Sequence, residues 1–81
     1  MATVDTLQVS FEFQHFPITS TNISSAAWSN DVLEVKFRSG YTYRYFGVPE
    51  QTYLDLIDPT LKVSKGMYLK KSVEGKVYRR V

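Results

Sequence analysis

The sequence predicts a small α+β fold: an antiparallel β-sheet with one or two short helices packed on one face. Three observations lead to this fold class. Apolar and polar residues alternate in the first half of the chain, as in half-buried strands. Apolar residues recur at helical spacing in the second half, after a proline that suits a helix start. The chain has 81 residues, 43% of them hydrophobic and 15% aromatic, so we expect one globular domain rather than a disordered segment.

The first element expected is a strand over Leu7–Phe13, where apolar and polar residues alternate until Pro17 ends the run. His15 continues this alternation, so we interpret it as a strand-end residue rather than a base or a metal ligand. A second, weaker strand is expected over Asn22–Trp28. Its alternation places on one face Ile23, Ser25 and Ala27, and on the other face Trp28.

A hairpin is expected from the alternating segments 33–37 and 41–45, which flank a Ser-Gly pair. A two-residue loop would bring cations of the first strand onto the tyrosine face of the second. A three-residue loop over 38–40 instead gives one apolar face and pairs Glu34 with Arg44 across the strands. We favour the three-residue loop, which predicts that the tyrosines at 41, 43 and 45 belong to the core rather than to a base-stacking platform.

Two helices and a last strand follow. Pro49 suits the first turn of a helix, and Asp58-Pro59 stops it. Ser64 is a good N-cap for a second short helix, which Gly75 can terminate. The segment Lys76–Val81 then reads as a short strand.

The charge of the chain is unevenly distributed. The net charge is +2, yet residues 60–81 carry seven of the ten Lys and Arg residues and a single acid, Glu74. The first 59 residues carry seven of the eight acids. A basic segment of this kind attracts anions, above all phosphates, although charge runs are also common as plain solvated surface.

The expected site begins at the second helix. Ser64, Lys65 and Gly66 would bring a hydroxyl, an ammonium group and backbone N–H groups to one anion at the helix N-terminus. The alternative is an N-cap with a glycine in the first turn. Further cations would extend this phosphate-binding surface: Lys70, Lys71, Arg79 and Arg80. Aromatic residues that would stack a base beside it are Trp28, Tyr68 and Tyr78.

Catalysis and metal binding are not expected. The chain has no Cys and one His, which excludes disulfides and cysteine-based zinc sites, and its carboxylates do not cluster at ligand spacing. No serine nucleophile elbow or phosphate-binding glycine loop occurs. We therefore predict no catalytic residues, no metal and no cofactor.

Several of these segments together resemble a known family. They are Leu33–Phe37, Tyr43–Pro49, Ser64–Gly66 and Tyr78–Val81. This combination resembles the KTSC domain, a small module named for its place at the C-terminus of some lysyl-tRNA synthetases. The resemblance covers residues 20–81, and residues 1–19 then form an extra N-terminal strand or extension. It implies a small stand-alone protein of a bacterium or a bacterial virus, and it hints at RNA.

Three functions are therefore expected in order of preference. The first is a non-enzymatic module that binds RNA, DNA or a nucleotide through its basic, aromatic-flanked surface. The second is a phage anti-defence protein that sequesters a cyclic nucleotide signal or inhibits a host defence protein. A homo-oligomer is one form expected of such a protein. The third is a protein-interaction module that pairs through the N-terminal edge strand. With no apolar run long enough to span a bilayer and no secretion signal, we expect no membrane partner and a cytoplasmic location, the host cytoplasm if the protein is viral.

Overall fold

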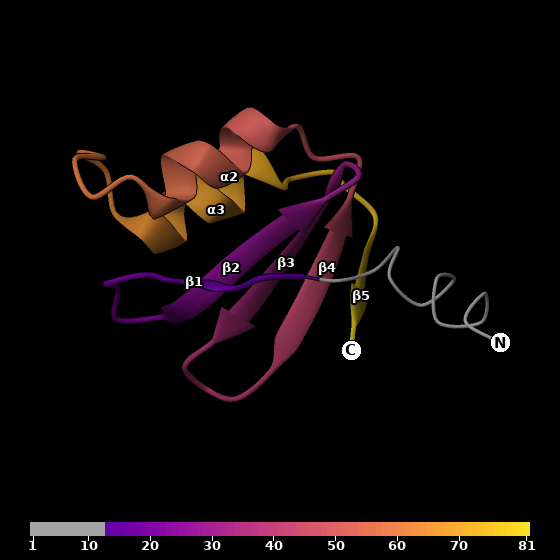
Figure 1. The fold of residues 1–81 in the computed structure, drawn as a ribbon, viewed down its shortest axis with the longest axis horizontal. Helices are drawn as coiled ribbons and strands as arrows, with labels where there is room; N and C mark the ends of the chain where they lie inside the picture. The colour runs from indigo at the N-terminus through magenta and orange to yellow at the C-terminus, as the bar shows by residue number, and fades with distance from the viewer. Residues whose placement is uncertain (1–12) are drawn as a thin grey trace, which may run out of the picture.

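The computed structural model describes residues 13–81 and has a five-stranded antiparallel sheet whose strands follow chain order. Both helices lie side by side on one face of this sheet (Figure 1). The predicted α+β fold is thus confirmed. The predicted strand over Leu7–Phe13 lies outside the described residues, apart from Phe13. The elements are β1 (Phe16–Pro17), β2 (Ile23–Ser29), β3 (Val32–Phe37), β4 (Thr42–Phe46), α2 (Glu50–Ile57), α3 (Lys65–Ser72) and β5 (Tyr78–Arg80).

The β3–β4 hairpin has the register predicted from its charges. Glu34 lies opposite Arg44, and the three-residue loop closes where the N–H group of Phe37 donates to the carbonyl of Tyr41 over 2.9 Å. Gly40 ends the loop with a φ of 105°, a conformation that L side chains rarely adopt. The loop length thus fixes which face of the hairpin carries the tyrosines.

The predicted faces of β2 are correct for Ser25, Ala27 and Trp28 but wrong for Ile23. The pairing of β2 with β3 shifts register between Ile23 and Ser25, as at a β-bulge. The extra residue reverses the alternation, so Ile23 lies on the same face as Ala26 and Trp28, toward the helices, and Ala27 lies on the other face. A bulge adds one residue to one strand only, and the alternation of the sequence gives no sign of it.

The helices begin as predicted, and α3 ends early. Pro49 is the N-cap of α2, and the helix stops before Asp58. Ser64 caps α3, because its hydroxyl accepts the N–H group of Met67 over 3.1 Å. The prediction that Gly75 terminates α3 is wrong by a few residues: Val73 is the C-cap, and its N–H group still bonds the carbonyl of Leu69. Gly75, with a φ of 80°, completes the turn that follows.

The core fills the space between the helices and the sheet. Its fully buried side chains are Ile23, Leu33, Val35, Val48 and Leu56. Burying one such side chain is worth about 1.5–3 kcal/mol. Because α2 packs on β2 and on α3, this core lies toward the β2 side of the sheet and leaves the β4–β5 side less covered. Among residues 13–81, neither helix has the length and apolar character needed to cross a bilayer.

Candidate functional site

The cations of the C-terminal strand point to opposite faces of the sheet. Arg80 lies opposite Tyr43 and Arg79 opposite Arg44 in the pairing of β4 with β5. Residues directly opposite each other in an antiparallel pair share a face. Arg80 is therefore on the helix side with the tyrosines, whereas Arg79 is on the far face, so these two arginines do not belong to one patch.

The N-terminus of α3 offers two backbone donors. The hydroxyl and the carbonyl of Ser64 accept the N–H groups of Met67 and Tyr68. The N–H groups of Lys65 and Gly66 start the helix and so have no acceptor within it. These two donors, with the positive end of the helix dipole, suit an anion.

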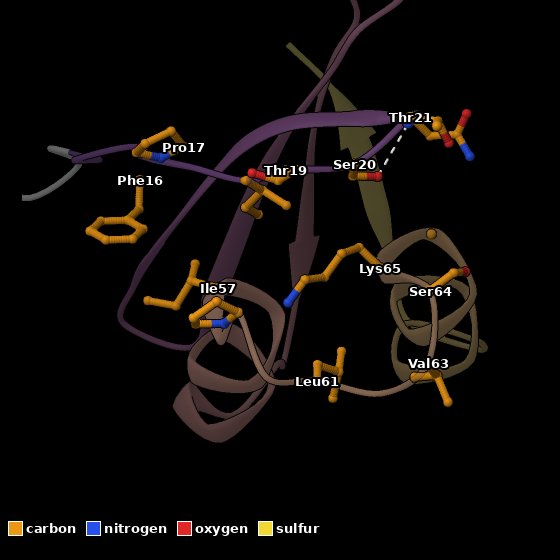
Figure 2. Close-up of a pocket in the computed structure, with 14 residues that line it drawn as sticks. Phe16, Pro17, Thr19, Ser20, Thr21, Ile57, Leu61, Val63, Ser64 and Lys65 are labelled. Atoms are coloured by element: carbon orange, nitrogen blue, oxygen red, sulfur yellow. Dashed lines mark hydrogen bonds between the residues drawn. The ribbon is translucent and has the colours of Figure 1, made fainter.

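A first hollow of about 630 Å³ lies beside this helix start (Figure 2). Its walls are largely apolar and include Phe16, Ile57 and Leu61. Figure 2 shows Lys65 extending from α3 across the hollow toward Ile57, and its ammonium group donates to the carbonyl of Asp58. The pKa of the Asp58 carboxyl is lowered, first by hydrogen bonds from Thr60 and to a smaller extent by the charge of Lys65. Lys65 thus has an acceptor within the fold.

A second hollow of about 570 Å³ lies on the other side of the helix start and is basic. Arg38, from the end of β3, and Lys70, from α3, both line it, and the described residues of its lining include no acid. The Nε group of Arg38 donates to the carbonyl of Ser20 over 2.6 Å, which fixes the guanidinium group. The sequence predictions missed Arg38, because it comes from outside the basic C-terminal segment.

The two hollows share part of their walls. Both are lined by Thr21, Asn22, Ser64 and Gly66. A Cβ atom on Gly66 would lie 3.2 Å from Nδ2 of Asn22, which is a tight contact. The glycine therefore allows the β1–β2 loop to approach the start of α3 closely, and the two hollows meet there.

The three predicted stacking residues differ in their surroundings. The indole N–H of Trp28 donates to the carbonyl of Val48 over 2.7 Å. The hydroxyl of Tyr68 donates to Oδ2 of Asp55 over 2.7 Å, and burial, then this contact, raise the pKa of the Tyr68 phenol. Trp28 and Tyr68 both pack against the core, whereas Tyr78 is 63% exposed.

Tyr78 belongs to a row of aromatic side chains on the helix side of β4 and β5. This row, here called the tyrosine strip, consists of Tyr41, Tyr43, Tyr45 and Tyr78. Tyr45 packs against the core as predicted, but Tyr41 is 52% exposed, so the prediction of a buried row is wrong at that position. Burial, and then the neighbouring phenols of Tyr43 and Tyr78, raise the pKa of Tyr45. A third hollow of about 310 Å³ opens beside the strip.

The far face of the sheet carries a cluster of polar groups. The two ring nitrogens of His15 lie 2.7 Å from the Ser25 hydroxyl and 2.7 Å from Oε1 of Glu34. The Nε group of Arg44 donates to Oε2 of Glu34 over 2.8 Å. The guanidinium group of Arg44 also lies over the ring of Phe13. The contacts of His15 join the segment before β1 to the sheet. Within residues 13–81, no set of three His, Asp or Glu side chains is grouped as it would be to hold a metal ion.

The comparisons with known proteins agree with this architecture. Residues 19–78 match the KTSC domain. A crystal structure of a KTSC domain protein from Yersinia pestis is similar to this chain, with 32% sequence identity and a TM-score of 0.72. The similarity covers 86% of this chain and 99% of that chain. No protein with a curated description matches. The chain therefore belongs to the KTSC domain family.

Proposed function

We propose that the protein is a non-enzymatic binding module for a phosphate-bearing ligand, a nucleic acid or a nucleotide, and that the second hollow is its phosphate site. The observation that carries the proposal is that Arg38 and Lys70 line one hollow together with Ser64 and Gly66 at the start of α3, and that its described lining has no acid. Two cations in one hollow beside the N–H groups of a helix N-terminus are an arrangement that phosphate groups favour.

Arg38 and α3 supply complementary donors. With its Nε group held by the Ser20 carbonyl, Arg38 keeps its two terminal amino groups without a partner among residues 13–81. These groups would make charge-assisted hydrogen bonds to phosphate oxygens, and the N–H groups of Lys65 and Gly66 would approach from the helix. Lys70 adds a second positive charge to the lining of the hollow.

The test is a titration of the full chain with pyrophosphate, followed by backbone N–H chemical shifts. We expect the largest shifts at Lys65 and Gly66, and their loss in Arg38→Ala and Lys70→Ala. Lys36→Ala is the matched control, because it removes the same charge from an exposed position of β3 whose partner, Ser25, is on the far face. Unchanged shifts at Lys65 and Gly66 with millimolar pyrophosphate would overturn the proposal.

A sequestered nucleotide signal, as in the anti-defence role, is one form of the same ligand chemistry. A thermal-shift panel of linear and cyclic nucleotides distinguishes it, because a ligand at a hundredfold excess over Kd stabilises the folded state by about 2.7 kcal/mol. A rise in Tm with a cyclic dinucleotide but not with pyrophosphate or oligonucleotides would favour the anti-defence role.

A second candidate function is protein interaction through the N-terminal edge. β1 is the outermost strand of the described sheet, and an edge strand can pair with another chain. Sedimentation of the full chain over a range of concentrations tests for a homo-oligomer, and pull-down with the full chain tests for a host protein. A monomer that captures no partner would count against this candidate.

A further inference from the structure

A row of aromatic rings connects the second hollow to the third. Phe37 lines the second hollow, and its ring centroid lies 5.8 Å from that of Tyr43. Tyr43 lies in turn 5.9 Å from Tyr78 and 6.3 Å from Tyr45. Tyr43, Tyr45 and Tyr78 all line the third hollow. Phe37 therefore connects the second hollow to the tyrosine strip.

Two tyrosines on this face are exposed to solvent, although the face lies on the helix side of the sheet. The helices cover the β2 side, where α2 contacts the sheet, and β5 lies away from them (Figure 1). Tyr78 and Tyr41 are 63% and 52% exposed, respectively. Exposed aromatic rings on one face of a small protein are typical of binding sites.

Cations accompany the rings along the whole row. The guanidinium group of Arg80 lies over the ring of Tyr41, 4.8 Å from its centroid. Lys76 lines the third hollow, and Arg38 and Lys70 line the second. The described residues that line these two hollows include no acid. Rings interleaved with cations complement a strand that alternates bases with phosphates, and they fit an apolar or acidic peptide less well.

We propose that single-stranded nucleic acid lies along this track, with bases stacked on Tyr43 and Tyr78 and phosphates bound by Arg80 and by the second hollow. The inference rests on the proposed phosphate site and deepens it by naming the ligand class. Only a single strand exposes the faces of its bases, because a duplex buries them in its own stack. A mononucleotide would occupy one end of the track only.

The test is fluorescence anisotropy of labelled oligo(dT) and oligo(rU), from about 2 to about 12 nucleotides, with the full chain. We expect affinity to rise with length and to fall with salt. Tyr78→Ala should weaken binding about tenfold, whereas Tyr78→Phe keeps the ring and should stay within about twofold. Because Tyr78 is exposed, neither change opens a cavity in the core, and circular dichroism checks that the fold survives the loss of the ring contacts with Tyr43 and Tyr45.

Arg80→Ala and Arg79→Ala form a matched pair. They remove the same charge from adjacent exposed positions, but only Arg80 lies on the face of the tyrosine strip. Arg80→Ala should weaken binding and reduce the salt slope by about one, and Arg79→Ala should change both much less. Equal effects of the two changes would overturn the track.

Other outcomes separate this inference from the proposed function. If Arg38→Ala weakens oligonucleotide binding and Tyr78→Ala does not, the phosphate site stands and the track is wrong. If affinity stops rising beyond a dinucleotide, or if a duplex binds as well as a single strand, the track is also wrong. If pyrophosphate and every oligonucleotide fail to bind, both proposals fall. A preference between oligo(rU) and oligo(dT) supports the track and identifies its natural strand as RNA or DNA.

Discussion

Nε2 of His15 and Oε1 of Glu34 lie 2.7 Å apart and join the segment before β1 to the middle strand of the sheet. Glu34 is only 8% exposed, and its second oxygen accepts a hydrogen bond from Arg44. A nearly buried carboxylate in this sheet therefore depends on two basic partners, one from each side.

This pairing predicts that Glu34→Gln destabilises the protein by about 2 kcal/mol, because a neutral amide replaces a charge that two basic groups surround. The measurement is urea unfolding near neutral pH. Glu74→Gln, at an exposed turn position, is the control and should cost little. Equal stability of the two variants would mean that the Glu34 contacts add nothing to the fold.

Trp28→Phe should cost about 1–2 kcal/mol, because the Val48 carbonyl loses the indole donor that it accepts at 2.7 Å. Thermal unfolding followed by circular dichroism measures this, since the variant has no tryptophan left for fluorescence. Oligonucleotide affinity should change little, because the indole N–H donates to the Val48 carbonyl and Trp28 packs against the core. An unchanged Tm in Trp28→Phe would mean that this hydrogen bond adds nothing to the stability of the fold.

Ser64 allows the capping role and the binding role to be separated. Ser64→Ala should destabilise α3 by about 1 kcal/mol, whereas Ser64→Asp keeps a good N-cap and should leave stability nearly unchanged. The Asp carboxylate would, however, repel phosphate from the second hollow, so pyrophosphate and oligonucleotide binding should fall by tenfold or more. Unaltered binding in Ser64→Asp would place the phosphate elsewhere.

Stability should decline at alkaline pH because of Tyr45. Its pKa is raised above the ordinary value of 10.0, chiefly by burial, so folding favours the neutral phenol. This contribution is complete below pH 10 and is lost as the pH rises through the raised pKa of the folded state. Tyr45→Phe should therefore flatten the fall of Tm above about pH 10. An equal fall of Tm with pH in the two proteins would contradict this prediction.

The sequence predicted the β3–β4 hairpin well because two independent signals agreed there. The pairing of Glu34 with Arg44 and the position of Gly40 both required the same register. The face of Ile23 was not predictable in this way, since a bulge changes the phase without changing the composition. Ser64 was identified as a cap because its side chain acts within one turn of the chain.

The candidate site was predicted only in part, because it depends on contacts between distant segments. The uneven charge predicted a site made from the C-terminal segment, yet Arg38 reaches the helix start from the end of β3. The charge of that segment could not distinguish Arg79 from Arg80, which the pairing with β4 places on opposite faces. Burial of the tyrosines was predicted from the alternation in the hairpin alone. That alternation does not show how far the helices extend over β4.

The order of the strands has a consequence for how the molecule assembles. β2, β3 and β4 are joined by short turns, so their pairing costs little loop entropy, whereas both helices lie between β4 and β5 in the sequence, so the pairing of these two strands closes a longer loop. The tyrosine strip is divided between β4 and β5, so Tyr78 lies beside Tyr43 only when these two strands pair. A ligand that contacts both strands would thus stabilise the pairing of β4 with β5, and it would slow the loss of β5 from the sheet.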